Sequence, residues 1–214
     1  MQQRFNIGVG STVAVRPVNQ QAEGGSIPTP TLHSFIKEIS HTTARLWVEH
    51  WHYSRRLPTG KNISYGLFMN NELYAVIVYG LGVNPYQAQS LGVNSVLEIK
   101  RMCRSEPPQD YPLSRFIAIT AKMVKRQMDY DCLIAFADPA QGHEGTVYKA
   151  AGFVLHGVTG KEMHVVGADG VPRHRRYAYR YARRNNVTIQ EARDRLGLSR
   201  IATEPKYRWI RRVA

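Results

Sequence analysis

The feature that most constrains the fold is residues 132–158, which predict a strand, a turn, a short helix and a second strand in direct succession. Residues 132–137 form a short apolar run, as is typical of a central strand buried on both faces. The turn, Gln141-Gly-His-Glu-Gly145, has two glycines that let the backbone bend sharply, and the helix expected over 144–151 ends at Gly152. A strand-helix-strand unit of this kind indicates an α/β fold built in layers.

The rest of the chain predicts a mixed, mostly antiparallel sheet with helices on both faces. Residues 63–68 and 73–79 are typical of a hairpin, since Asn70 and Asn71 between them tolerate left-handed backbone angles. Further strands are expected around 13–15 and at 96–102 and 174–181, and residues 80–94 are expected to form a long loop. Residues 33–51 have helical spacing, with Thr42 or Thr43 able to cap a helix through Val48. Further helices are expected at 113–128 after Pro112 and at 188–196 after a capping box.

The charge of the chain is large and unevenly distributed. Its 29 Lys and Arg outnumber its 16 Asp and Glu, and 13 of the basic residues but only three of the acidic ones lie in the segment 173–214. A basic surface attracts phosphate polyanions and releases their counterions, which favours a nucleic acid as partner over a surface that is merely basic. We therefore expect an N-terminal arm over 1–31, an α/β domain over 32–182 and a basic C-terminal extension over 183–214.

The composition indicates a protein of the cytoplasm. No apolar stretch approaches the roughly 18–20 residues that a membrane span needs, and the N-terminus lacks the charged-then-apolar pattern of a signal peptide. The two cysteines, Cys103 and Cys132, lie in strand-like surroundings without metal-ligand spacing, which indicates buried, reduced thiols.

Two polar groups near predicted element ends are candidates for a functional site. Asp138 follows the buried strand, where α/β sheets bind ligands, so it could accept a proton or hold a cation; alternatively, it only caps the next helix. His52 and Tyr53 offer a base or metal ligand beside a phenol, and Arg55 and Arg56 could meet phosphate; alternatively, this loop is ordinary surface.

Two further groups lie on the predicted strand at 96–102 and at the start of the helix at 113–128. Regular alternation would put Glu98 and Lys100 on one face of the strand and Arg101 on the other, unless a β-bulge intervenes. The alternative for this group is a solvated strand face. Ser114 lies in the first helical turn, where free amides favour an anion, although a serine there is also a common cap.

As a set, these motifs resemble the Mom family of phage DNA-modification proteins. The resemblance covers roughly residues 45–160, and its most specific part is the last of the matching motifs. The motifs are His52-Tyr53-Ser54 with Pro58-Thr-Gly60, Tyr65-Gly66-Leu67-Phe68, Glu98-x-x-Arg101, Pro112-Leu-Ser114-x-Phe116, Ala137-Asp138-Pro139 and Gly142-His143-x-Gly145-x-x-Tyr148-x-Ala150-x-Gly152-Phe153.

The resemblance implies a fold similar to the GCN5-related N-acetyltransferases and a transferase activity on DNA. The family converts adenine in DNA to the N6-carbamoylmethyl (acetamido) form, which protects phage DNA from restriction enzymes in the cytoplasm of the host bacterium. The catalytic positions would be His52, Tyr53, Arg101, Ser114, Asp138 and Tyr148. Iron is associated with the family, and its ligands would be His52, Tyr53 and Asp138.

The same resemblance implies double-stranded DNA as partner and a site for a group donor. We expect Arg55, Arg56, Arg175, Arg176 and Arg180 to contact DNA, and Ser114, Arg115 and Gly142 to hold the donor. Residues 104–115 contain no glycine, unlike the pyrophosphate loop of the acetyltransferases, so we do not expect acetyl-CoA as donor. A glycine-derived or aminoacylated donor is as tenable.

Other functions stay open at this point. The chain could be an acyltransferase acting on a protein or a small amine, or a basic DNA-binding protein without catalysis. Whether it forms a homodimer is also left open by the sequence.

Overall fold

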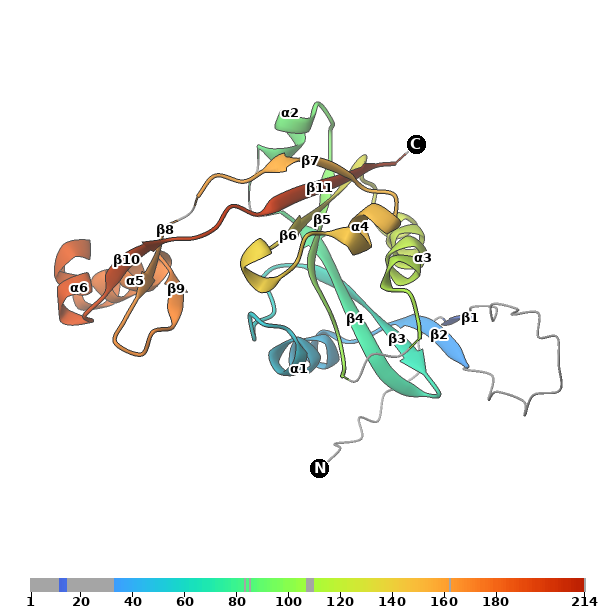
Figure 1. Ribbon diagram of the computed structural model, residues 1–214, viewed down its shortest axis with the longest axis horizontal. Coiled ribbons are helices and arrows are strands. Elements are labelled where there is room, and N and C mark those ends of the chain that lie inside the picture. The colour runs from blue at the N-terminus through green and yellow to red at the C-terminus, as the bar shows by residue number, and fades with distance from the viewer. Residues whose placement is uncertain are drawn as a thin grey trace. The chain divides into compact units, whose positions relative to one another are not determined.

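The computed structural model describes residues 12–14, 33–82, 84, 86–106, 110–161 and 163–213 (Figure 1). Contacts between residues divide the chain into two compact units. The core unit contains the described residues up to Ala135, Val147–Val154 and those from Ile210 on. The basic unit contains Phe136–Thr146 and Leu155–Trp209. Apart from residues 12–14, the predicted N-terminal arm lies outside the described residues.

The main sheet has eight strands in the order β1-β2-β3-β4-β5-β6-β11-β7. Strands β1 to β5 pair antiparallel with their neighbours, and β5 pairs parallel with β6, which confirms the predicted mixed and mostly antiparallel sheet. The strands are β1 (Thr12–Ala14), β2 (Ser34–Glu38), β3 (Asn62–Met69), β4 (Glu72–Leu81), β5 (Val96–Arg104), β6 (Cys132–Ala137), β7 (Val154–Val158) and β11 (Tyr207–Arg212).

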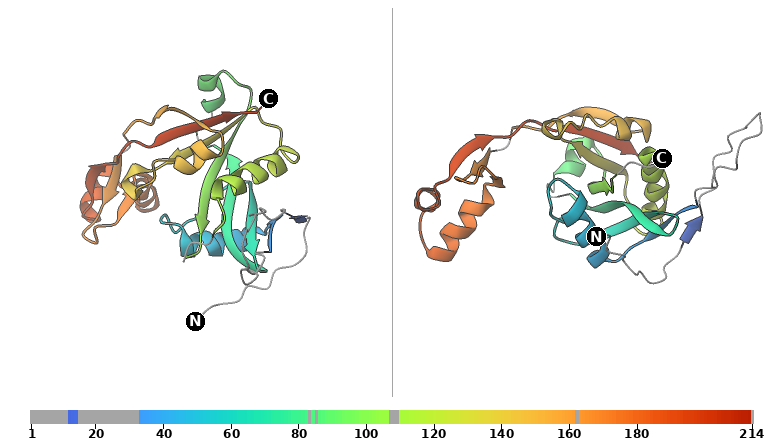
Figure 2. Two further views of the ribbon diagram at one scale, coloured as in Figure 1. Left: turned by 45° about the vertical axis from the view of Figure 1, so that its right-hand side comes forward. Right: turned by 60° about the horizontal axis from the view of Figure 1, so that its bottom comes forward.

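Helices cover both faces of this sheet, as expected (Figure 2). Val78 of β4 packs in the cluster beneath α1, whereas the neighbouring Tyr79 makes a 2.8 Å hydrogen bond to the hydroxyl of Thr120 in α3. Because successive side chains of a strand point to opposite faces, α1 and α3 lie on opposite sides. The helices formed wholly or mainly by core-unit residues are α1 (His41–Trp51), α2 (Gln87–Leu91), α3 (Leu113–Lys125) and α4 (Thr146–Ala150).

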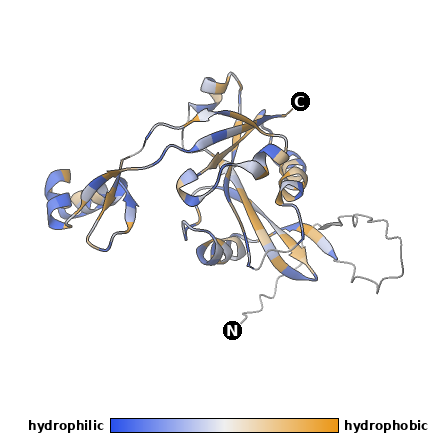
Figure 3. Cartoon of the chain, in the orientation of Figure 1, coloured by the Kyte–Doolittle hydropathy of each residue, from blue (hydrophilic) through white to orange (hydrophobic). Residues whose placement is uncertain are grey.

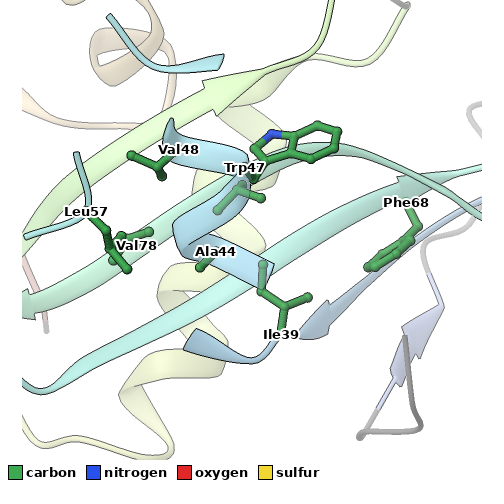
Figure 4. Close-up of a cluster of buried hydrophobic side chains, with 8 residues drawn as sticks. Ile39, Ala44, Trp47, Val48, Leu57, Phe68 and Val78 are labelled. Atoms are coloured by element: carbon green, nitrogen blue, oxygen red, sulfur yellow. The ribbon is translucent and has the colours of Figure 1, made fainter. Parts of the chain in front are cut away.

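The packing of α1 fixes the loop that follows it. Ala44, Trp47 and Val48 have the i, i+3, i+4 spacing of one helical face, and all three are buried against the sheet (Figure 4). Ser40 caps the helix by accepting a 3.1 Å hydrogen bond from the amide of Thr43. Leu57 from the loop after α1 is buried in the same cluster, so this loop is anchored to the core.

The basic unit contains a second, three-stranded antiparallel sheet and two helices. The order of the strands in this sheet is β10-β8-β9. A capping box between Thr188 and Glu191 confirms the predicted start of the last helix. Figure 3 shows this last helix mainly as hydrophilic, in contrast to the hydrophobic strands β3 and β4. The elements are η1 (Pro139–Gln141), β8 (Met163–Val166), β9 (Pro172–His174), α5 (Arg176–Asn185), α6 (Ile189–Arg195) and β10 (Ser199–Ala202).

Three local expectations were wrong. Residues 34–38, which the sequence assigned only helical spacing and no strand, form β2, because Phe35 stacks on Phe68 with ring centroids 4.9 Å apart as the strand pairs with β3. The strand expected at 174–181 is mostly the helix α5, since Ala178 and Ala182 are buried four residues apart while the arginines point outward. The loop expected at 80–94 contains the end of β4 and the short helix α2. None of the helices in the described part of the chain is long and apolar enough to cross a membrane.

Candidate functional site

A polar cluster in the core unit begins at the end of α1 with His52 and Tyr53. The two rings lie 4.3 Å apart, and His52 is buried whereas Tyr53 is about half exposed. The Nδ1 atom of His52 accepts a 3.0 Å hydrogen bond from the amide of Ser54, and the Ser54 hydroxyl lies 2.9 Å from the same nitrogen. Because Nδ1 acts as an acceptor, the proton of a neutral His52 resides on Nε2.

Arg101 of β5 ties the loop after α1 to the sheet. Its Nε donates a 3.1 Å hydrogen bond to the carbonyl of Arg56, and its Nη1 donates to the carbonyl of Lys100. Asn62 supports the same loop by donating a 2.8 Å hydrogen bond to the carbonyl of Pro58. The predicted motifs at 52–60 and at 98–101 are therefore linked directly, with Arg101 as the connecting side chain.

A β-bulge at Lys100 changes the expected alternation of β5. Tyr79 pairs with Ile99 and Val78 with Arg101, so Lys100 is the extra residue of the strand. Burial lowers the pKa of Arg101, while the acidic groups of Tyr53 and Glu98 raise it. Burial also lowers the pKa of Lys100, and Glu98 opposes that shift. Glu98 and Arg101 thus act on each other electrostatically, which regular alternation would not have predicted.

Tyr148 of α4 joins this cluster from a different part of the sequence. Its side chain is buried, and burial raises the pKa of its phenol, with further increases from Tyr53 and Glu98. A phenol with a raised pKa stays protonated near neutral pH, so it donates hydrogen bonds and gives up its proton only to a strongly basic leaving group. The structure therefore brings together Tyr53, Glu98, Arg101 and Tyr148, of which Glu98 was not among the predicted site residues. Its signal was the motif Glu98-x-x-Arg101.

Asp138 lies in the basic unit, and both of its carboxylate oxygens have partners there. Oδ1 accepts a 3.2 Å hydrogen bond from the amide of Ala140, which caps η1. Oδ2 lies 3.1 Å from Nζ of Lys206, and the Asp138 side chain is only 13% exposed. These contacts are those of the capping role that the sequence offered as the alternative for Asp138.

The two glycines after Asp138 are each required by the structure, but for different reasons. Gly142 ends η1 with a φ of +70°, and no atom lies within 4 Å of the place where a side chain would begin. Gly145 has a φ of +85°, and a Cβ there would overlap the indole of Trp209. Gly142 is therefore required for its backbone angle alone, whereas Gly145 is also required for the packing of Trp209.

The start of α3 carries the predicted donor-binding residues Ser114 and Arg115. The first turn contains no acidic residue, and Pro112 at the N-cap makes no side-chain cap. The Arg115 guanidinium lies 5.8 Å from the centre of the Tyr111 ring. Burial raises the pKa of Tyr111 and Arg115 lowers it, so the two groups interact. The binding of an anion at this helix end by Ser114 and Arg115 therefore remains a proposal.

The predicted DNA-contacting arginines lie at two places. In the core unit, Arg55 adopts a φ of +47°, and its guanidinium donates to the carbonyls of Glu49 and His50 at the end of α1, while Arg56 is exposed. In the basic unit, three arginines around the start of α5 are exposed: Arg175, Arg176 and Arg180.

Two of the three predicted iron ligands, His52 and Asp138, have contacts that compete with metal binding. His52 would have to offer Nε2 without a proton, but Nδ1 already accepts from the Ser54 amide. The oxygens of Asp138 are taken by Ala140 and Lys206. Within the described residues, no three His, Cys, Asp or Glu side chains are grouped so as to hold a metal ion.

Comparison with known proteins gives one family match. A family model described as the Mom protein family matches residues 33–214. A curated relative, the methylcarbamoylase mom of Escherichia phage Mu, is 24% identical over 148 residues, which make up 67% of this chain. The match spans about 61% of the length of that relative.

Solved structures of acetyltransferases share part of the backbone arrangement. An IAA acetyltransferase from Bacillus cereus ATCC 14579 has 11% identity and a TM-score of 0.47, covering 84% of this chain and 99% of the other. An aminoglycoside acetyltransferase in complex with coenzyme A has 10% identity and a TM-score of 0.46, covering 84% and 94%. At these low values, neither structure assigns any chemistry to this chain. Since the family model covers residues 33–214 of 214, this chain belongs to the Mom protein family.

Proposed function

We propose that this chain is a transferase that modifies the N6 amine of adenine in DNA, giving the N6-carbamoylmethyl form. Its membership of the Mom family and its relative in phage Mu, named as a methylcarbamoylase, support this proposal. The modification would protect phage DNA from restriction enzymes in the bacterial cytoplasm. The single observation that carries the proposal is the cluster of Tyr53, Glu98, Arg101 and Tyr148, whose electrostatic coupling is typical of an acid–base site.

The product defines what the site must do. In a carbamoylmethyl group the atom bonded to N6 is a methylene carbon, so the new bond is an alkyl carbon–nitrogen bond rather than an amide. N6 must lose a proton as this bond forms, and the leaving group of the donor must gain one. The target adenine must also leave the base stack, since its N6 otherwise pairs with thymine.

The core-unit cluster offers a residue for each of these proton transfers. We assign proton acceptance from N6 to Glu98, because it is the carboxylate that acts on both Arg101 and Tyr148. Tyr148 holds its proton and would donate it to the leaving group. Arg101 holds the loop with His52 and Tyr53 in place through the carbonyl of Arg56. Arg101 is thus a positioning residue in this scheme.

Asp138 receives a structural role in the proposal. Its contacts with Ala140 and Lys206 fix the turn after β6. Ser114, Arg115 and Gly142 remain proposed contacts for the donor. Arg55, Arg56, Arg175, Arg176 and Arg180 remain proposed contacts for DNA phosphates.

The test is mass analysis of nucleosides. The chain is produced in bacteria, the total DNA is digested to nucleosides, and deoxyadenosine is searched for a species heavier by one carbamoylmethyl group. We expect this species with the wild-type chain and not with Glu98→Gln. Unmodified deoxyadenosine despite good yields of folded wild-type protein would refute the proposed activity. DNA binding without a new nucleoside would favour a non-catalytic DNA-binding protein.

A further inference from the structure

The basic unit contains a pocket of about 380 Å³ that is lined by cationic side chains. Side chains from all three strands and both helices of this unit reach it. The lining includes four side chains with a permanent positive charge, namely Lys161, Arg175, Arg193 and Arg200, together with His164 and His174. Among the described residues, no carboxylate belongs to this lining. The pocket therefore gathers like charges that repel one another unless an anion is present.

The two histidines are fixed against each other by the strands that carry them. His164 of β8 and His174 of β9 are direct cross-strand partners, and their ring centroids lie 5.7 Å apart. His174 Nδ1 also accepts a 3.1 Å hydrogen bond from the amide of Arg176, the first residue of α5. The sheet thus holds the imidazoles in one place instead of leaving them as loose surface groups.

Three of the described acidic residues that lie near this cluster in sequence have other partners. Asp169 forms an ion pair with Arg173, which is not part of the pocket lining. Glu191 accepts a 2.8 Å hydrogen bond from the amide of Thr188 in the capping box. Asp194 accepts a 3.0 Å hydrogen bond from the side chain of Gln190. Each of these carboxylates therefore makes a local contact that holds a turn or a helix.

Arg193 supplies a second observation that points to a ligand. Its Nη1 donates a long hydrogen bond of 3.4 Å to Gln190, but its Nε is buried without a hydrogen-bond partner among the described residues. A buried guanidinium N–H is costly when unpaired, and phosphate oxygens match the geometry of a guanidinium well. Tyr179, which also lines the pocket and is nearly half exposed, adds an aromatic face on which a sugar or base can pack.

We propose that this pocket binds the phosphate group of a nucleotide, supplied by the DNA strand that the core unit modifies. The inference rests on the proposed function for the choice of DNA as the source. Of the pocket residues, only Arg175 was among the DNA contacts predicted from the sequence. The volume of about 380 Å³ lies within the range of roughly 300–1,000 Å³ that is usual for small-molecule sites, so a phosphate with its sugar is a suitable occupant.

The experiment compares matched arginine variants of the full chain. Arg200→Gln and Arg193→Gln each remove one positive charge from the pocket, and Arg195→Gln removes one from the same helix as Arg193 but outside the lining. Binding of a fluorescently labelled DNA duplex is measured by anisotropy over a series of sodium chloride concentrations. Arg200 is exposed, so its replacement should leave the fold intact even if Arg193→Gln does not.

The two pocket variants should weaken binding by about tenfold, and each should lower the slope of log affinity against log salt by about 1. Arg195→Gln should change the affinity by less than about threefold, because Arg195 is exposed and lies outside the pocket lining. Equal losses in Arg195→Gln and Arg200→Gln would overturn the proposal, because they would show only general attraction to positive charge.

Competition then identifies the source of the phosphate. Deoxyadenosine monophosphate and inorganic phosphate are added to the wild-type complex at constant ionic strength. Displacement of the duplex by the mononucleotide assigns the pocket to a free nucleotide and overturns DNA as its source. Absence of displacement together with the losses in the arginine variants supports a phosphate within the strand.

The catalytic variant separates this inference from the proposed function. Glu98→Gln should still bind the duplex with the dependence on Arg200 that the wild type shows, since the pocket residues are unchanged, while forming no modified nucleoside. If DNA binding depends on Arg200 but no modified deoxyadenosine forms, the proposed activity is refuted and the proposal for the pocket stands. If modified deoxyadenosine forms and Arg200→Gln binds the duplex as the wild type does, the proposal for the pocket is refuted and the proposed activity stands.

Discussion

Replacing Gly145 with alanine should destabilise the basic unit much more than the same change at Gly142. Both residues have a positive φ, +85° and +70°, so alanine at either position bears the cost of a left-handed backbone, about 1–2 kcal/mol. At Gly142 the space around the new methyl group is open, and a gain of about 0.4–1 kcal/mol from the less flexible unfolded chain offsets part of that cost. The expected loss for Gly142→Ala is therefore about 0–1.6 kcal/mol.

At Gly145 the methyl group would overlap the indole of Trp209. Trp209 is buried, so its ring cannot move into solvent without losing its own packing, and overpacking of this kind costs about 1–3 kcal/mol. With the same backbone terms as at Gly142, the expected loss for Gly145→Ala is about 1–4.6 kcal/mol, which is about 1–3 kcal/mol more than for Gly142→Ala. The difference between the two variants isolates the contact with Trp209, because the backbone term is common to both.

Urea unfolding followed by tryptophan fluorescence measures this difference. Trp47 and Trp51 are first replaced by phenylalanine, so that Trp209 is the remaining reporter. The transition midpoint of Gly145→Ala should fall well below that of Gly142→Ala, with similar slopes for both. If the two midpoints agree, Trp209 does not pack on Gly145 and the reasoning fails.

Three further predictions concern the core unit. Glu98→Gln should lower DNA modification, measured by nucleoside mass analysis, by about 100-fold or more. Asp138→Asn should retain the modification once it is corrected for the amount of folded protein. The reverse result would show that Asp138, and not Glu98, accepts the proton from N6. Arg101→Lys should lose the bond to the Arg56 carbonyl, and hydrogen exchange should then quicken over residues 53–61 without a general loss of protection. Burial raises the pKa of the Cys103 thiol to about 12, so the thiol stays protonated at pH 8 although its side chain is only partly buried. Iodoacetamide should therefore label it much more slowly in the native chain than under denaturing conditions, and equal rates would contradict the raised pKa.

Elements with strong local signals could be predicted from the sequence. The hairpin of β3 and β4, the apolar β6, the helix after Pro112 and the capping box at Thr188 all depend on residues close in sequence, and all are present. The strand β2 was missed because its position depends on pairing with β3. The helix α5 was missed because its alternating arginines and tyrosines resemble a strand, whereas its two buried alanines have helical spacing.

The candidate site shows the same division between local and distant signals. Motifs placed His52, Tyr53, Arg101 and Tyr148 among the important residues. The role of Glu98 depends on the bulge at Lys100, and that bulge is a property of the pairing between β4 and β5 rather than of β5 alone. The pocket of the basic unit depends on five elements that meet only in the folded chain, so no short motif could indicate it.

The path of the chain has a consequence for the order in which the protein can fold during synthesis. The core unit is left at Phe136, re-entered at Val147, left again at Leu155 and completed only from Ile210 on. Its last residues make bonds to partners synthesised much earlier, since Arg211 donates to the carbonyl of Ala151 and Arg212 to that of Leu91, 121 positions away. The core unit therefore cannot reach its final form until residues 210–213 have left the ribosome. Contacts this distant in sequence slow folding, so a ribosome stalled before residue 210 should hold a core unit that proteases still cleave.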